Sequence, residues 1–218
     1  MSEKTYRALR HDIVRKRQRE NNDDAHHPKE KREQIKLYLD NKAGLKILEL
    51  FCGQGNLSDL YEMYGDLERY DKKLKTGDSY RVFHELISKR KIYDVVDLDP
   101  YGFPSRFFPD VFLLIDDGLL FLTFPKPWIN IMNGITQTHL FAYYGSSNPT
   151  LEQIQEKIAL FGLCHWRKVC FLEVVDLGRL WRMVLRVEKI KATEYTGTVN
   201  QPAAETKPKN SSIQLRLW

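Results

Sequence analysis

Two glycines and an acidic residue stand where a short apolar segment ends, in the run ELFCGQGN at 49–56. Residues 46–51 are long enough for one buried strand, and a helix is expected from about Asn56. Glycines in such a turn let the backbone approach a ligand closely, and a helix N-terminus points free N–H groups at it. The dinucleotide fingerprint has a third glycine where this chain has Ser58, which disfavours a phosphate-binding turn.

Further acids follow at the ends of later expected strands. Asp71 lies 22 residues after Glu49, where a ribose-binding carboxylate belongs in such sheets. Asp78 precedes an expected helix, and Asp99 lies in the run DLDPYG at 97–102, which we assign to the fourth strand–helix unit. Taken alone, Asp99 and the proline after it could form an ordinary turn. Acid-bearing turns at one end of successive parallel strands predict a single ligand crevice.

The hydrophobic pattern predicts the elements that must position these turns. Helices are expected at 5–20, 29–40, 56–64, 79–88, 105–115 and 151–161, and strands at 46–51, 66–70, 93–98 and 118–124. Residues 166–190 read as two strands joined by a short turn at 176–179, which is a hairpin signal. The expected fold is α/β with a Rossmann-like, mostly parallel sheet closed by an antiparallel C-terminal hairpin. We expect a basic helical extension at 1–40, the catalytic domain at 41–191 and a disordered tail at 192–218.

The order of these motifs resembles the class I S-adenosylmethionine-dependent methyltransferases over about residues 46–190. ELFCGQGN looks like their first motif, YDKK their second, TGDS their third and DLDPYG their fourth. The terminal hairpin is similar to the antiparallel sixth and seventh strands of that fold. Motif four is most similar to the tRNA guanine-N2 dimethyltransferases, where it reads D-L-D-P-[FY]-G, and is related to the D-P-P-Y motif of amino-methyltransferases. The chain departs from the family between Asp71 and Asp78, where only six residues replace the usual helix, and it lacks the large C-terminal domain of the tRNA enzymes.

The resemblance implies S-adenosyl-L-methionine as the cofactor, no metal, and a role for each matching residue. Gly53 and Gly55 would pass under the methionine portion, Asp71 would bond the ribose hydroxyls, and Asp78 would lie near the adenine. The implied cofactor-binding set is Glu49, Phe51, Gly53, Gly55, Asn56, Asp71, Asp78 and Ser79. The implied catalytic set is Asp99, Pro100 and Tyr101: Asp99 and the backbone after Pro100 would accept hydrogen bonds from a substrate amine, and Tyr101 would stack on the base.

These residue types suit methyl transfer to an exocyclic amine of a nucleic-acid base. Such an amine is a poor nucleophile because its lone pair is delocalised. Acceptors placed around its protons favour the reactive geometry, which is catalysis by positioning and electrostatics. An aromatic ring beside those acceptors can hold a flipped or unpaired base.

The net charge of +5 lies wholly in the two extensions. Residues 1–40 carry eleven Lys/Arg and eight Asp/Glu, residues 191–218 carry four and two, and residues 41–190 carry nineteen of each. Basic arms around a neutral core suit a polyanion, although solvated tails that aid solubility are the alternative. We expect a cytoplasmic protein without membrane association, since no apolar run could span a bilayer, no secretory signal stands at the start, and the three cysteines form no paired framework. Cys52 is interpreted as a small apolar filler rather than a nucleophile.

The last five residues, QLRLW, resemble the peptide by which bacterial proteins bind the DNA sliding clamp. Gln214, Leu215, Leu217 and Trp218 would be its anchors; the alternative is that this segment folds back as an edge strand. Motif four thus favours RNA guanine-N2 as the target, and the tail favours a DNA adenine or cytosine amine. Trp128, in the run FPKPW, fits either a wall for a base or a packed turn. A small-molecule methyltransferase and a non-catalytic nucleic-acid-binding protein that retains the fold are further alternatives.

Overall fold

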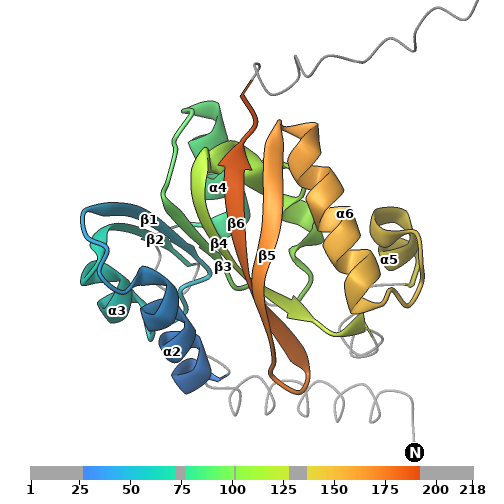
Figure 1. Cartoon of the computed structure of the whole chain (residues 1–218), viewed down its shortest axis with the longest axis horizontal. Coiled ribbons are helices and arrows are strands. Elements are labelled where there is room, and N and C mark those ends of the chain that lie inside the picture. The colour runs from blue at the N-terminus through green and yellow to red at the C-terminus, as the bar shows by residue number, and fades with distance from the viewer. Residues whose placement is uncertain (1–26, 72–76, 101, 128–136, 192–218) are drawn as a thin grey trace, which may run out of the picture.

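A computed structural model describes residues 27–71, 77–100, 102–127 and 137–191 (Figure 1). Several predictions of the sequence fall outside these ranges. They are the basic helix at 5–20, Tyr101, Trp128, and the tail with its Gln214–Trp218 peptide.

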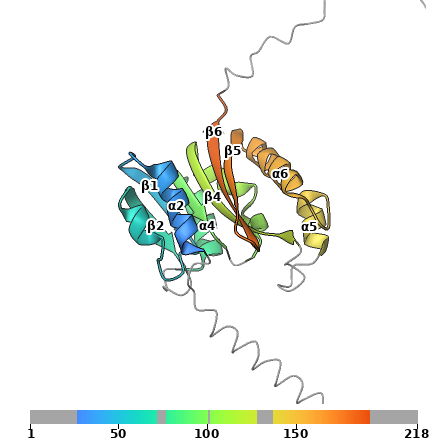
Figure 2. The ribbon, with the colours of Figure 1, turned by 60° about the horizontal axis from the view of Figure 1, so that its bottom comes forward.

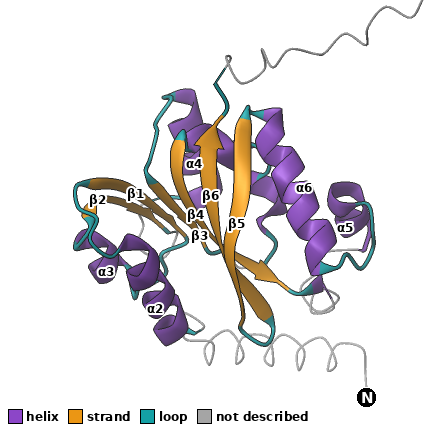
Figure 3. Cartoon of the chain, viewed as in Figure 1, coloured by secondary structure: helices purple, strands orange, loops and turns teal. Residues whose placement is uncertain are grey.

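The centre of the fold is one six-stranded sheet in the order β2-β1-β3-β4-β6-β5 (Figure 3). Four strands run parallel: β1 (Leu45–Leu50), β2 (Gly65–Tyr70), β3 (Val95–Leu98) and β4 (Asp117–Pro125). The hairpin of β5 (Arg167–Asp176) and β6 (Leu180–Lys189) closes the sheet, and β6 pairs antiparallel with both β4 and β5. The predicted fold class, a mostly parallel Rossmann-like sheet ending in an antiparallel hairpin, is confirmed.

Apolar side chains cover both faces of the sheet because successive residues of a strand point to opposite sides. One face packs against α2 (Pro28–Leu39) and α3 (Ser58–Glu62) through Ile35, Leu39 and Leu60. The other packs against α4 (Ser79–Ser88) and α6 (Leu151–Cys164), and α5 (Gln137–Tyr144) lies next to α6. Figure 2 shows α2 in front of the parallel strands.

The helix predicted at 29–40 is confirmed as α2, and the side chains of Ile35 and Leu39 are fully buried against the sheet. The division between extension and domain at residue 40 stays a prediction. The structure adds that α2 contributes to the same core as β1 and β3. The part of the N-terminal segment that the structure describes is therefore packed against the sheet.

The helix predicted at 105–115 is wrong. Two short 3-10 helices, η1 (Pro104–Phe107) and η2 (Asp110–Leu114), occupy this stretch. Pro109 lies between them, and a proline there has no N–H for a continuous α-helix and clashes with the preceding turn. The sequence prediction also missed α5. The run DLDPYG follows β3, which is the third strand and not the fourth. In the described residues only α4, and no further strand, lies between β2 and β3.

None of the helices in the described residues is both long and apolar enough to cross a bilayer.

Candidate functional site

The chain reverses direction across the sheet between β1 and β3. From β1 the next strand, β2, lies on one side, whereas β3 lies on the other and leads on to β4. This arrangement is a topological switch point, and open α/β sheets bind ligands outside the carboxyl ends of the strands at such a point. The turn at 51–56 follows β1 and Asp99 follows β3. The structure therefore brings two of the sequence motifs together at one edge.

The turn after β1 has the left-handed backbone that glycine favours. Gly53 and Gly55 have φ angles of 57° and 88°, and Phe51 has one of 66°. A Cβ added at Gly55 would lie 3.2 Å from Oγ of Ser58 and 3.3 Å from Arg69. A positive φ at a bulky aromatic residue such as Phe51 is uncommon and concentrates at functional sites. The backbone of this turn is thus one that glycine adopts without strain, and a side chain at Gly55 would press against Ser58 and Arg69.

Asp71 joins this turn to the end of β2. The Gly53 backbone N–H donates to Oδ2 of Asp71 at 3.2 Å, and the Asp71 side chain is buried. Main-chain N–H groups of Phe51 and Cys52 donate to the Tyr70 carbonyl at 2.9 and 3.5 Å. The carboxylate predicted to bind ribose therefore lies directly beside the glycine turn.

The acid of the third motif is used by the helix that follows it. Asp78 is the N-cap of α4, and its Oδ1 accepts from the backbone N–H groups of Tyr80 and Arg81 at 3.0 and 3.3 Å. The Ser79 hydroxyl donates to the Tyr70 carbonyl at 3.1 Å. Asp78 thus stabilises the start of α4 and Ser79 ties it to β2, and their predicted places beside the cofactor stay predictions.

An aromatic cluster connects the first and fourth motifs. The ring of Phe51 packs edge-to-face on Phe107 of η1, with centroids 5.5 Å apart. Phe107 also contacts Tyr80 and Phe83 of α4 at 5.7 and 5.0 Å. Because η1 begins two residues after DLDPYG, this cluster packs the segment that follows the fourth motif against the glycine turn.

A buried ionic network lies on the α2–α3 face of the sheet, and the sequence analysis missed it. Both guanidinium NH groups of Arg182 on β6 donate to Asp97, at 2.9 and 2.6 Å, and Tyr61 of α3 donates to the same carboxylate at 2.6 Å. The side chains of Asp97 and Arg182 are 1% exposed. Burial and the Asp97 charge raise the pKa of Tyr61 well above its ordinary value. Arg182 also donates to the Thr123 hydroxyl at 2.9 Å.

Glu49 belongs to the same face, one strand away from Asp97 in register. Its Oε2 accepts from the Ser58 hydroxyl at 2.5 Å, and its side chain is buried. Burial raises the pKa of Glu49 to about 8, opposed by the hydrogen bond from Ser58 and assisted by the charges of Asp97 and Asp99. The acid within the first motif is therefore mostly protonated at neutral pH.

Asp99, the predicted acceptor of the substrate amine, forms an ion pair with α2. Nζ of Lys31 donates to its Oδ2 at 2.5 Å. Burial alone would raise the pKa of Asp99, but the charges of Lys31 and Arg182 and hydrogen bonds from Lys31 and Thr123 bring it below the ordinary value. Asp99 is thus ionised at neutral pH. Sequence reasoning placed Lys31 in a basic extension and had no signal that it reaches the site.

Cys52 fits the filler interpretation. It is buried, and burial together with the charges of Glu49 and Asp71 raises the pKa of its thiol to about 12. A thiol that stays protonated at neutral pH is a poor nucleophile.

Two other residues predicted for the site lie beside groups already described. Pro100 directly follows Asp99, and the Asn56 carbonyl accepts from Arg32 at 2.8 Å. No group of three or more metal-ligating side chains occurs in the part of the chain that the structure describes.

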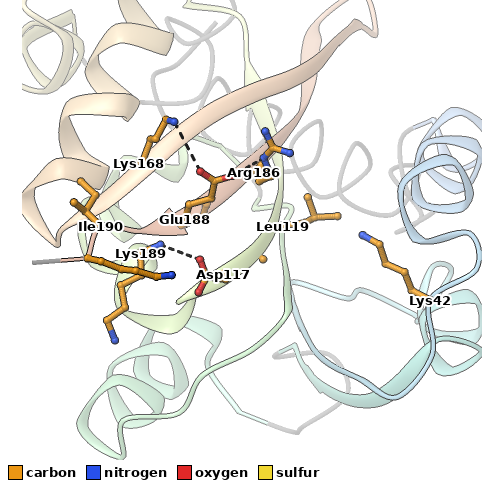
Figure 4. A pocket seen from close by; sticks show the side chains of 11 residues that line it. Lys42, Asp117, Leu119, Lys168, Arg186, Glu188, Lys189 and Ile190 are labelled. Carbon is orange, nitrogen blue, oxygen red and sulfur yellow. Dashed lines mark hydrogen bonds and ion pairs between the residues drawn. The ribbon is translucent and has the colours of Figure 1, made fainter. Parts of the chain in front are cut away.

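A groove of about 460 Å³ lies at the opposite edge, where β4 begins and β6 ends (Figure 4). Its lining includes five basic side chains, Lys42, Lys168, Arg186, Lys189 and Lys191, and two acidic ones, Asp117 and Glu188. Glu188 pairs with Arg186 at 2.9 Å and with Lys168 at 3.9 Å. None of the residues predicted for the site lines this groove.

Comparison with known proteins finds likeness only among solved structures. No protein-family model and no curated protein matches the chain. The magnesium protoporphyrin IX methyltransferase ChlM from Synechocystis PCC 6803, solved with bound SAH, is 17% identical over 75% of this chain and 84% of its own, with a TM-score of 0.48. TYW2 from M. jannaschii, solved with AdoMet, is 14% identical over 74% and 75%, with a TM-score of 0.46.

Trm1 from Pyrococcus horikoshii, solved with S-adenosyl-L-methionine, is 11% identical over 67% of this chain, with a TM-score of 0.43. The chain spans about half of that protein, 51% of its length. The fold assignment itself rests on the strand order and register of this chain: it is an α/β protein with a Rossmann-like sheet.

Proposed function

We propose that this chain is an S-adenosyl-L-methionine-dependent methyltransferase that acts on an exocyclic amino group of a nucleic-acid base. The observation that carries the proposal is the meeting of the glycine turn and Asp99 at the switch point of the sheet. Gly53, Gly55 and Asp71 offer the glycine turn and the adjacent carboxylate that the motifs of the resembling family use for this cofactor. When bound, the cofactor would supply an electrophilic methyl group and leave as S-adenosylhomocysteine, and the proton that the amine loses would pass to Asp99 or to solvent.

The residues of the chain account for the rest of the chemistry. Asp99 is ionised and its side chain is 21% exposed, so it can accept a hydrogen bond from an amine that approaches from outside. Accepting that bond orients the amine lone pair and offsets the positive charge that develops on nitrogen as the methyl group arrives. Protonated Glu49 adds no further negative charge beneath the site.

Nucleic acid is the substrate class that the rest of the chain supports best. Residues 1–40 and 191–218 carry the whole net charge of +5, and a small-molecule enzyme has little use for basic arms. The choice between RNA guanine-N2 and a DNA adenine or cytosine amine stays open. The sliding clamp, as partner of the terminal peptide that includes Leu217 and Trp218, remains part of the DNA alternative.

Two measurements test the proposal together. Calorimetry should show binding of S-adenosylmethionine that Gly53→Arg abolishes, and labelled cofactor should methylate either total RNA or genomic DNA. Asp99→Asn should lower transfer at least a hundredfold while cofactor affinity stays within about threefold, because Asp99 is assigned to the amine. Absence of cofactor binding would refute the enzyme, and transfer to small molecules alone would refute the substrate class.

A further inference from the structure

Helix α2 places a buried ammonium group on the acid assigned to the substrate amine. Lys31 is 1% exposed, and its Nζ lies 2.5 Å from Oδ2 of Asp99. We propose that Lys31 is a positioning residue for methyl transfer: it holds the Asp99 carboxylate through Oδ2 and leaves its remaining acceptor capacity for the amine. This inference rests on the function proposed above. It assigns α2, which the sequence places before the first motif, to the reaction site.

Stability alone does not explain a lysine at this position. Removing an ammonium group from water costs several kcal/mol, and replacing a buried ion pair by apolar side chains is often neutral or stabilising. Helix α2 is already anchored by Ile35 and Leu39, both fully buried against the sheet. An apolar residue at position 31 would extend that contact, so the ion pair points to a role beyond holding the helix.

A second contact sets the position of α2 along the site. The guanidinium group of Arg32 donates to both carboxylate oxygens of Asp59 at 2.7 and 3.1 Å, and to the Asn56 carbonyl at 2.8 Å. Asn56 ends the glycine-turn motif and Asp59 lies in α3. Adjacent residues of α2 thus contact the first motif through Arg32 and the fourth motif through Lys31, which fixes one relative to the other.

The Asp99 carboxylate retains room for a substrate. An ionised carboxylate has about four lone-pair sites. Lys31 and the Thr123 hydroxyl donate to it. The Thr123 hydroxyl can give its proton to Asp99 because its oxygen already accepts from Arg182 at 2.9 Å. The other lone-pair sites of the Asp99 carboxylate remain for a substrate amine, and the Asp99 side chain is 21% exposed.

The charges that face Asp99 come from several elements of the fold. Lys31 approaches from α2, Arg182 from β6 and protonated Glu49 from β1, while Asp97 precedes it on β3. Arg182 makes a bidentate pair with Asp97. Lys31 is therefore the cation that pairs directly with Asp99, and its loss should raise the pKa of that carboxyl group. An opposite charge this close typically lowers the pKa of an acid by about 1–3 units.

The test compares three variants of the full-length chain. Lys31→Met keeps the aliphatic stem and removes the charge, and Lys31→Arg keeps the charge. Lys36→Met makes the same change at an exposed position of the same helix and serves as the matched control. Thermal unfolding of each variant establishes that it is folded.

Two readouts separate positioning from a purely structural role. Carbon-13 NMR of aspartate-labelled protein, assigned with Asp99→Asn, follows the titration of Asp99. We expect Lys31→Met to raise its midpoint by at least about one pH unit. The second readout is kcat against pH, measured with labelled cofactor on total RNA and on genomic DNA. The midpoint of its acid limb should shift to higher pH by the same amount as the Asp99 titration, while KM for the cofactor stays within about threefold. Lys31→Arg should restore most of kcat, and Lys36→Met should resemble the unmodified chain in both readouts.

The possible results point to different conclusions. An unchanged Asp99 titration in Lys31→Met, or a pH profile that stays in place while the titration moves, overturns the role of Lys31 and leaves the proposed function standing. A loss of activity in Lys31→Met that Lys31→Arg does not restore also overturns it. Absence of methyl transfer by the unmodified chain on either nucleic acid refutes the proposed function itself, whatever Asp99 does in the titration.

Discussion

The carboxyl edge of the sheet, where the parallel strands end, and its amino edge, where they begin, differ in how exposed their charged side chains are to water. At the carboxyl edge, Lys31, Asp97 and Arg182 are at most 1% exposed. At the amino edge, the side chains of Lys168 and Glu188 are 65% and 39% exposed. A charge pair interacts several times more strongly in a poorly hydrated interior than in water. The buried charges of the carboxyl edge should therefore respond to pH and to single substitutions, and the exposed pair of the amino edge mainly to salt.

One residue at the amino edge departs from this contrast. Arg167, at the start of β5, is 6% exposed and pairs with Asp116. It also donates to the carbonyl oxygens of Ile115 and His165 at 2.6 and 2.9 Å. These partners lie in the segments that precede β4 and β5, so Arg167 joins two connections of the fold and none of the predicted site.

The largest effect is expected from breaking the buried pair. Arg182→Met leaves the Asp97 carboxylate buried without its cation, which should lower the free energy of unfolding by about 3–5 kcal/mol in urea titrations. Adding Asp97→Leu should recover a large part of the loss, because the unpaired charge is then gone. Tyr61→Phe removes only one hydrogen bond to Asp97 and should cost about 1–2 kcal/mol. If the single and double variants were equally unstable, the pair would not be the cause.

A smaller effect, visible only as a pH dependence, is expected from Glu49. The pKa of this carboxyl group is about 4.5 in the unfolded chain and about 8 in the folded chain. Ionisation therefore favours the unfolded state, and the stability contribution is fully present below about pH 4.5 and lost as pH rises towards 8. Between pH 4 and pH 7 this amounts to about 3 kcal/mol, at 1.36 kcal/mol per unit.

Glu49→Gln tests this pH dependence, since glutamine keeps the shape of the side chain and does not titrate. Over the same range, the stability of the variant relative to the unmodified chain should increase by that amount, measured by urea unfolding at each pH. Asp66→Asn is a suitable control because Asp66 lies on the adjacent strand β2, away from Glu49, Asp97 and Asp99. Parallel stability curves for Glu49→Gln and the unmodified chain would show that Glu49 is ionised in the fold.

The sequence predicted the parts of the site that depend on local pattern. Gly53, Gly55 and Asp71 were predicted because a turn after a buried strand needs glycine and because Asp71 lies 22 residues after Glu49, where such sheets have a carboxylate. The Asp97–Arg182 pair could not be found in this way, because its two residues are 85 positions apart and meet only when β6 joins β4. Lys31 was missed for the same reason, since 68 positions separate it from Asp99. The residues around a lysine in a basic segment do not indicate that its side chain is buried.

The smallest effect is expected at the amino edge, from the pair of Lys168 and Glu188. Their charged atoms are 3.9 Å apart and both side chains are well exposed, so the pair is worth about 0.5 kcal/mol or less. Lys168→Met keeps the aliphatic stem on the edge strand β5 and should change the free energy of unfolding by no more than that. In 1 M salt, where the Debye length is about 3 Å, even this difference should vanish, whereas the loss in Arg182→Met should persist because salt does not reach Asp97. A Lys168→Met effect above about 1 kcal/mol, or one that high salt leaves intact, would mean that the amino edge holds its charges as the carboxyl edge does.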